Sequence, residues 1–494
     1  MSLPRLRLPF LLFAASLAAG CTAGADYRRP ELPHAAQYPH RAALGARAGA
    51  NTANTADAAE LRQWWTAFGD PRLTHLVTVA LAQNLDLAQA QARVRQARAA
   101  TGAADAALLP SASLGGQAAR AYQSVQTPLG QVLDATPGHD RAGSARELNL
   151  QASWELDLFG GLRREREAAR ADYEASEAGW AATRLAVAAQ TADLYLSIQG
   201  LQARLDLARR QVDTEAALLE LATLLYDKGL LNEQALRQAE ASLAQARAVV
   251  PGLDTAREVA LHALDVMLGA APGTYGDEMA AAGVMARAPR ITADGAPGEL
   301  LRRRPDLIAA ERRLAAASAR TGAAVAEYYP KLSLGALFGS ATSGGALFGS
   351  GSGQAAGMLG LRWRLFDFGR IDAQIEASRG REAELLAAYR LAALHAAEDV
   401  ENACSALLRH EEQAALLAQS VQAFERARAA ALAAYEKGVV SRLDVLQADT
   451  RLLRAADARA QAQTASARAA VATYRALGGG WQAPQAETEA MAAR

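Results

Sequence analysis

The chain has 494 residues, with 52 basic and 52 acidic side chains, so its formal net charge is zero. This balance argues against nucleic acid as the main partner, because such a partner calls for a basic face. The length allows two to four domains. Ala, Leu, Gln, Arg and Glu dominate the composition, which favours long helices, and only 5% of the residues are aromatic.

Residues 1–20 have the features of a secretory signal peptide. Arg5 and Arg7 give a positive start, and a largely apolar run over 8–19 follows. That run is too short to span a bilayer as a helix, which needs about 20 residues. Small residues then precede Cys21, in a pattern that resembles the lipidation box of bacterial lipoproteins. We expect lipid on Cys21; an ordinary signal peptide with an incidental Cys is the alternative.

A first folded unit is expected over 71–269, after a lipidated tether and lead-in segment over 21–70. Asp70 and Pro71 form a good helix start, with Asp as the cap and Pro in the first turn. Alternating apolar and polar residues further along predict a strand with one face of each kind. The expected elements are helices over 72–109, 161–226 and 232–268, and a strand pair over 111–122 and 147–157. The longest helix would measure about 99 Å at 1.5 Å per residue.

The second half of the chain repeats the first. The sequence YDKGL at 226–230 recurs as YEKGV at 435–439, and Phe159-Gly160 recurs as Phe368-Gly369, each 209 residues later. Upstream landmarks lie 220 apart, as in Pro110 and Pro330. One unit of about 200 residues was therefore duplicated, with a longer loop between the strands of the first copy.

The second unit is expected over 298–478, with a strand pair over 331–338 and 358–366. The segments 270–297 and 479–494 lack periodicity and are expected to pack together at mid-length, between the stacked helices. Four strands per chain cannot close a barrel, and lipid does not tolerate an open sheet edge. Two chains would give 8 strands and three would give 12, both allowed barrel sizes. The alternative is a soluble hairpin that packs on its own helices.

Several motifs, in this order, resemble the outer-membrane efflux proteins of the TolC class. These motifs are Trp65-x-x-Phe68-x-Asp70-Pro71-x-Leu73, Asn84-Leu85-Asp86-Leu87, Tyr329-Pro330-x-Leu332, Phe368-Gly369-Arg370 and Ala476-Leu477-Gly478-Gly479-Gly480-Trp481. The sequence LLRRRPDL at 300–307 resembles the lipoprotein branch that includes OprM and the NodT-type proteins. The resemblance covers nearly the whole chain from about residue 60 to 481.

This resemblance implies an internally duplicated α+β membrane protein. The expected architecture is a trimeric 12-stranded outer-membrane β-barrel, four strands per chain, continued by a long α-helical barrel with a mixed equatorial region. The implied function is that of a passive exit duct of a tripartite efflux pump, without enzyme activity or cofactor. Its partners would be two further copies, outer-membrane lipid, a periplasmic adaptor (membrane fusion) protein and an inner-membrane RND-type transporter. A type I protein-secretion channel is the alternative, and a coiled-coil structural lipoprotein is a third.

The resemblance also places a periplasmic gate at the tip of the last helix hairpin. Leu443 and Asp444 match an apolar constriction position and the first gate aspartate of the family. Gln447 stands where the family often has a second Asp, and Asp449 and Arg451 follow, shifted from the OprM-like arrangement. On a three-fold axis each Asp becomes a ring of carboxylates, which repel by up to about 4 kcal/mol at 4 Å and an effective dielectric near 20. We expect Asp444 or Asp449 to pair with Arg442 or Arg451. The alternative is that both are solvated helix residues with salt-bridge partners.

The two hairpin tips are the expected docking site for the adaptor. Each has a Gly after a Lys at the end of a long helix, as a left-handed C-cap requires. Apolar residues follow each Gly at an exposed turn, which indicates a contact patch. The tip residues are Gly229, Leu230 and Leu231, and Gly438, Val439 and Val440.

Other candidate sites are weaker. The seven His residues show no ligand spacing on one helix face, so we expect no metal site. Cys404 lies in a helical run and is expected to be a small buried residue. The arginines at 302–304 precede a helix that starts with Pro, and we interpret them as a solvated cluster rather than an anion site.

Overall fold

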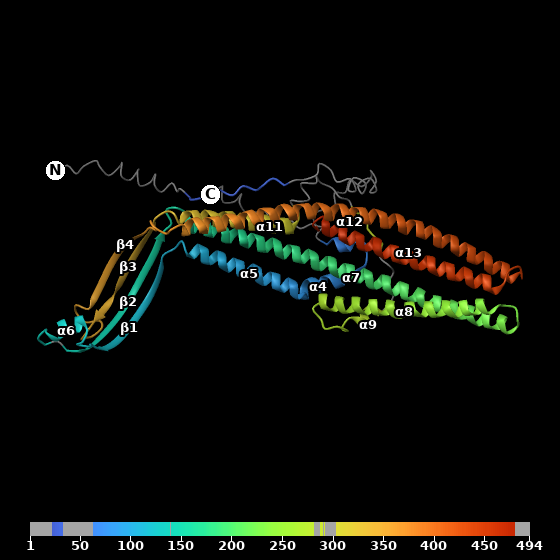
Figure 1. Ribbon diagram of the computed structural model, residues 1–494, viewed down its shortest axis with the longest axis horizontal. Coiled ribbons are helices and arrows are strands. Elements are labelled where there is room, and N and C mark those ends of the chain that lie inside the picture. Colours follow the sequence, from blue (N-terminus) through green and yellow to red (C-terminus); the bar gives the residue numbers. More distant parts are fainter. Residues whose placement is uncertain are drawn as a thin grey trace. The chain divides into compact units, whose positions relative to one another are not determined.

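The computed structural model describes residues 22–32, 63–138, 140–280, 287–289, 291 and 303–479 (Figure 1). The chain divides into two compact units, and each takes stretches from both sequence repeats. Unit 1 comprises Met1–Pro30, Arg95–Ala175 and Glu311–Ala388. Unit 2 comprises Glu31–Val94, Ser176–Ala310 and Tyr389–Arg494.

Unit 1 contains one antiparallel sheet of four strands in the order β1-β2-β3-β4. The strands are β1 (Ser111–Tyr122), β2 (Ala142–Leu156), β3 (Lys331–Thr342) and β4 (Gly353–Arg362). The predicted period of two is confirmed, and the pairing of β2 with β3 joins the two repeats. Three strands differ from their predicted bounds: β2 begins at Ala142 and not at 147, β3 ends at Thr342 and not at 338, and β4 begins and ends earlier than the predicted 358–366. Because Arg362 pairs with Lys331, the first residue of β3 after Pro330, β4 has no partner beyond that point.

The register sorts the sheet into an apolar and a polar face, because directly paired residues lie on the same face. Leu150 pairs with both Leu114 and Phe338. The next position along β2, Asn149, pairs with Gly115 and Gly339. Other members of the apolar face are Ala112, Leu148, Ala152, Trp154, Leu332, Leu334, Ala336, Leu359 and Leu361. The polar face includes Ser113, Gln117, Glu147, Gln151, Ser153 and Gln354.

The edges of this sheet are open in a single chain. Within the described residues, β1 pairs only with β2, and β4 pairs only with β3. All of β1 and nearly all of β4 are exposed to solvent on both faces. Large apolar side chains are among the exposed residues, including Leu114 at 68% and Leu359 at 69%. An exposed apolar surface of this kind marks a site of contact with another protein or with a membrane.

The helical part of unit 1 packs through small residues. It contains the end of α5 (Leu85–Ala106), the start of α7 (Gly161–Asp227), the end of α11 (Pro305–Ala326) and the start of α12 (Arg370–Glu436). A short helix, α6 (Pro128–Asp134), lies in the longer loop between β1 and β2. Five alanines of α7 and α11 pack together and against Tyr27. Small side chains let the two helices approach closely, which suits a thin helical wall.

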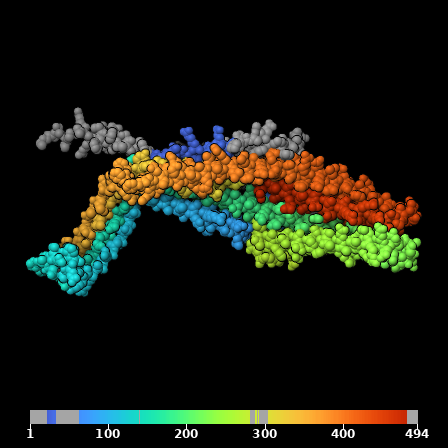
Figure 2. Space-filling model, viewed as in Figure 1, coloured from blue at the N-terminus to red at the C-terminus, as the bar shows by residue number. Residues whose placement is uncertain are grey.

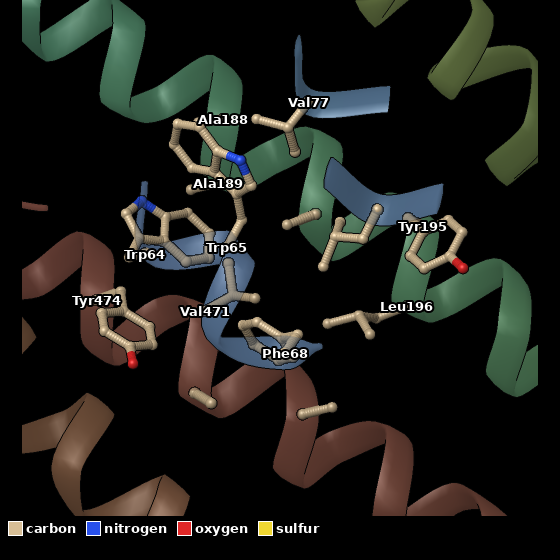
Figure 3. Close-up of a cluster of buried hydrophobic side chains, with 14 of the residues drawn as sticks. Trp64, Trp65, Phe68, Val77, Ala188, Ala189, Tyr195, Leu196, Val471 and Tyr474 are labelled. Carbon is tan, nitrogen blue, oxygen red and sulfur yellow. The ribbon is translucent and has the colours of Figure 1, made fainter. Parts of the chain in front are cut away.

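Unit 2 is built around one hydrophobic cluster (Figure 3). Its elements are η1 (Trp64–Phe68), α4 (Pro71–Gln83), α8 (Glu233–Met267), α9 (Gly276–Ala280), α13 (Arg442–Ala476) and the remaining parts of α5, α7, α11 and α12. Trp64 stacks on Tyr474 with ring centroids 5.2 Å apart. Phe68 and the leucines of α4 fill the centre of the cluster, each contributing about 1.5–3 kcal/mol when fully buried.

The start of α4 matches the prediction, but the single helix expected over 72–109 is wrong. Asn84 separates α4 from α5, because its side-chain oxygen accepts hydrogen bonds from the N–H groups of Asp86 at 3.0 Å and Leu87 at 3.1 Å and so caps α5. The Asp70 carboxylate accepts hydrogen bonds from the backbone N–H groups of Arg72 at 2.9 Å and Leu73 at 3.2 Å, with Pro71 in the first turn. Its other oxygen accepts a hydrogen bond from the Tyr195 hydroxyl at 2.6 Å. The cap therefore also ties α4 to α7.

The interpretation of Arg304 as part of a solvated cluster was wrong. Its side chain is only 9% exposed and pairs with Asp399 at 3.0 Å and Asp306 at 2.8 Å. It also donates hydrogen bonds to the carbonyl oxygens of Ala396 and Ala476. Ala476 is the last residue of α13, where carbonyl groups lack a partner within the helix. Arg304 is thus a buried clamp that joins α12 to the end of α13.

Candidate functional site

Two helix hairpins of unit 2 end in turns at the same end of the unit (Figure 2). In the first turn, Gly229 has φ +71° and donates its N–H to the Tyr226 carbonyl at 2.8 Å. The N–H of Leu230 donates to the Leu225 carbonyl, also at 2.8 Å. These two bonds form a Schellman motif, which satisfies carbonyl groups at the end of α7 and requires a left-handed residue.

The second turn has the same construction. Gly438 has φ +71° and donates to the Tyr435 carbonyl at 2.8 Å, and Val439 donates to the Ala434 carbonyl at 2.9 Å. The predicted left-handed glycines are therefore confirmed in both repeats. The helix after each turn also begins in a similar way, because Asn232 caps α8 and Ser441 caps α13 through their side chains.

Each turn exposes an apolar side chain directly after its glycine. Leu230 is 73% exposed and Val439 is 75% exposed. The next residues, Leu231 and Val440, are half-buried. Two tyrosines one turn back, Tyr226 and Tyr435, are also exposed on the ends of α7 and α12. We call Tyr226, Leu230, Tyr435 and Val439 the tip patch.

Asp444 belongs to a capping box at the start of α13. Its carboxylate accepts hydrogen bonds from the backbone N–H of Ser441 at 2.9 Å and from the Ser441 hydroxyl at 2.6 Å. The Asp444 N–H donates back to the Ser441 hydroxyl oxygen at 3.3 Å. The side-chain bond and then the backbone bond of Ser441 lower the pKa of Asp444 below its ordinary value. Sequence reasoning missed this role, although Ser followed three residues later by an acidic residue is a capping-box signal.

Asp449 pairs with Arg428 of α12. Within one chain, Asp449 thus pairs with Arg428 and not with the expected Arg442 or Arg451, while the expected pairing in a closed trimer stays a prediction. Asp449 lies on the side of α13 that faces α12, and residues two positions apart, such as Asp449 and Arg451, do not share a helix face. Asp444 and Arg442 are likewise two apart, and the carboxylate of Asp444 turns back to the cap.

The remaining gate candidates lie on the same first turns of α13. Leu443 is half-buried, and Gln447 and Arg451 are exposed. Leu443 and Gln447 are four residues apart, so they share a helix face. The structure therefore brings these two side chains together, while it directs Asp444 to the helix cap and Asp449 to α12.

Ion pairs join the two hairpins along their length. Arg204 of α7 pairs with Asp457 of α13 at 2.8 Å. Further along, Arg468 of α13 pairs with Asp193 of α7 through two hydrogen bonds of 2.7 and 2.9 Å. These contacts join the first repeat to the second well behind the tips. The acidic and basic residues were visible in the sequence, but their partners lie hundreds of residues away.

In unit 1, an exposed tryptophan marks the same place in each repeat. The indole N–H of Trp154 donates to the Leu108 carbonyl at 2.9 Å, and that of Trp363 donates to the Tyr328 carbonyl at 3.0 Å. The two Trp residues lie 209 positions apart and the two carbonyl groups 220 apart, which are the two offsets of the sequence repeat. Each Trp thus ties the second strand of its hairpin, or the residue just after it, to the end of the helix that leads into that hairpin. Amphipathic rings of this kind form girdles at the interfaces of membrane barrels.

None of the described helices combines the length and apolarity that a membrane-spanning helix needs. The apolar surface that the register builds lies instead on one face of the sheet, opposite a polar face.

Comparisons with known proteins agree with this architecture. The family model described as "Outer membrane efflux protein" matches residues 76–270 and 296–479. The pyoverdine export outer membrane protein OpmQ of Pseudomonas putida is 36% identical over 433 residues, which cover 87% of this chain and 91% of that protein. The toluene efflux pump outer membrane protein TtgF of Pseudomonas putida is 31% identical over 96% of this chain and 98% of that protein.

A solved structure of the outer-membrane channel OprN has the same fold. It superposes with a TM-score of 0.80 at 31% identity, covering 94% of this chain and 100% of that chain. The solved relatives are trimeric channels of the TolC class, and they are not enzymes. This confirms the predicted fold class and the outer-membrane location. The chain belongs to the outer membrane efflux protein family, and it is an outer-membrane exit duct of the TolC class.

Proposed function

We propose that three copies of this chain form a passive duct that conducts small toxic compounds, drugs among them, out of a tripartite pump. The observation that carries the proposal is the four-stranded sheet, with one apolar face, one polar face and an open edge at both β1 and β4. In lipid, each unpaired backbone group at such an edge costs several kcal/mol. Pairing β1 of one copy with β4 of the next removes every edge and directs the polar faces to a shared lumen.

The adaptor is proposed to dock at the tip patch. Its exposed apolar side chains Leu230 and Val439 sit on rigid turns, each held by two backbone hydrogen bonds. Because the two turns have the same construction, one kind of adaptor hairpin could contact both. The adaptor would join the duct to an inner-membrane transporter of the RND type.

The gate is proposed to lie at the start of α13, with Leu443 packing near the axis and Asp444 as a ring of three carboxylates. The capping box changes how such a ring would work. Asp444 accepts two hydrogen bonds from Ser441, so the carboxylate that would face the axis also caps α13. The ion pair between Asp449 and Arg428 binds α13 to α12, so the α12–α13 hairpin would move as one piece.

Lipid on Cys21 completes the proposal, although Cys21 lies outside the described residues. A lipid there would anchor the mature chain in the same membrane that holds the sheet. Mass spectrometry of the mature N-terminus tests this point: an acylated Cys21 supports it, and an unmodified start at another residue contradicts it.

The cargo is proposed to be small molecules, and the duct itself to be unselective. The named relatives differ in cargo, since one exports pyoverdine and another toluene. Deletion of the gene should raise susceptibility to drugs and solvents, and the wild-type gene should restore resistance. A type I secretion duct would instead lose a protein from the culture medium, with drug susceptibility unchanged. That result would replace the efflux proposal with the secretion alternative.

A further inference from the structure

Residues 22–26 form a strap that lies against the helical part of unit 1. The N–H of Ala23 donates to the carbonyl of Phe159 at 2.9 Å. Phe159 lies between the end of β2 and the start of α7. The strap therefore begins at the junction of the sheet with the helices.

Arg164 of α7 holds this strap with a buried guanidinium group. The residue is only 4% exposed. Its Nε donates to the Ala23 carbonyl at 3.1 Å, and one Nη donates to the Gly24 carbonyl at 3.2 Å and to Asp26 at 2.9 Å. The other Nη donates to Glu167 at 2.7 Å. The guanidinium fork thus meets two carbonyl oxygens of the strap and two carboxylates, a geometry that Lys cannot reproduce.

The strap also packs closely against the backbone of α11 and against Gly160, just before α7. Gly24 has φ +82°, and a Cβ there would lie 2.6 Å from Cα of Gly322 in α11. A Cβ on Gly160 would lie 2.7 Å from the Thr22 side chain. Further along, the Tyr27 hydroxyl donates to the buried Glu311 at 2.7 Å. The strap therefore touches the first repeat through α7 and the second through α11.

The junction that receives the strap is also where the apolar sheet ends. Trp154 and Trp363 lie there, exposed and each hydrogen-bonded to the end of a helix. Cys21 directly precedes Thr22, and consecutive Cα atoms are about 3.8 Å apart. A lipid on Cys21 would have no linker between itself and the strap.

We propose that Arg164 is a positioning residue that seats the strap, so that a lipid on Cys21 enters the membrane at the level of the β2–α7 junction. The depth of the barrel and the attachment point of the lipid are then set by one buried side chain. This inference rests on the lipidation proposed above. Without the clamp, the lipid would be tethered by a loose segment and would not fix the height of the barrel.

The test follows the depth of the strap in reconstituted vesicles. The fluorophore is attached to an Ala25→Cys variant, because position 25 is exposed on the strap. Cys404 is buried, so its thiol does not compete for the label. The vesicles contain lipids with a quencher either at the headgroup or deep in the acyl chain. When Arg164 is unchanged, the headgroup quencher should reduce the fluorescence more than the quencher deep in the acyl chain. Arg164→Ala should reduce headgroup quenching at least about twofold, because the strap leaves its seat.

Two further variants separate clamping from folding. Asp26→Ala removes a partner on the strap and leaves α7 intact, so it should also reduce quenching, though less. Arg170→Ala removes an exposed pair with Glu174 on the same helix and should leave quenching unchanged. Equal quenching in the wild-type and Arg164→Ala proteins would overturn the proposal, as would an equal loss in Arg170→Ala.

Trypsin gives a readout that does not depend on lipid. Arg28 is exposed just behind the strap, and Arg164→Ala should increase cleavage after it by about tenfold or more, since bonds to a charged group are lost. The released N-terminal peptide also shows by mass whether Cys21 carries lipid. A peptide without lipid would refute the lipidation, while the cleavage rates would still decide whether Arg164 holds the strap.

Discussion

The left-handed glycines at the hairpin tips allow a sharp test of adaptor docking. Gly229 and Gly438 both have φ +71°, and a Cβ at either position would meet no atom within 4 Å. Replacing both with Ala therefore adds no clash, and the cost comes from the backbone alone. A residue with a Cβ in the left-handed conformation costs about 1–2 kcal/mol. Each Schellman turn should therefore be destabilised by about that amount.

The expected result is weaker pumping with an intact duct. If the adaptor needs both turns in their native form, the double Ala variant should show higher drug susceptibility and an unchanged amount of trimer in the membrane. Replacing Gly438 with Asn should cost less, because Asn tolerates the left-handed region better than Ala. Drug susceptibility should therefore be lowest in the wild type, higher in Gly438→Asn and highest in the double Ala variant.

Gly179 supplies a matched control on α7. A Cβ there also meets nothing within 4 Å, but the residue has ordinary helical backbone. The same Gly-to-Ala change should stabilise the helix by about 0.5–1 kcal/mol and leave efflux unchanged. The reasoning fails if the double tip variant pumps like wild type, or if Gly179→Ala impairs pumping as much as the tip changes do.

Three further variants, at the start of α13 and just after β4, give further predictions. Leu443→Ala combined with Asp444→Ala should raise single-channel conductance in planar bilayers well above wild type; unchanged conductance with an intact trimer would place the gate elsewhere. Because the folded pKa of Asp444 is lowered, its capping contribution is present above the unfolded pKa and is lost as pH falls through the folded pKa. Ser441→Ala should therefore shift the loss of hydrogen-exchange protection at the start of α13 to higher pH, and an unshifted profile would refute this. Trp363→Phe loses the bond to the Tyr328 carbonyl and should lower the unfolding free energy by about 1 kcal/mol; equal stability in denaturant titrations would show that the bond contributes nothing.

Local signals in the sequence were enough for the strands, the tips and the first helix cap. The alternation around Leu150 gave the two faces of the sheet because the side-chain period of a strand is two. Asp70 followed by Pro71 gave the start of α4, and Lys followed by Gly gave both tip turns. In each case the residues that decide the structure are neighbours in the chain. The end of β4 was missed because it depends on where β3 begins, at Lys331.

Long-range partners were not predictable in the same way. Arg304 looked like a solvated residue because its partners Asp399 and Ala476 lie far along the chain. Asp449 was assigned to nearby arginines, although its partner Arg428 lies on the other helix of the hairpin. A single sequence shows which charges exist but not which helix faces meet. The same reason leaves the orientation of Leu443 toward the axis as a proposal.

Native mass spectrometry of the protein, released from mild detergent micelles, shows how many copies close the barrel. The open sheet edges at β1 and β4 must be closed by other copies of the same chain. We therefore expect a single species with the mass of three mature chains, each carrying the four strands of one sheet. A stable monomer or dimer with an intact fold would contradict the closure of the barrel by three copies.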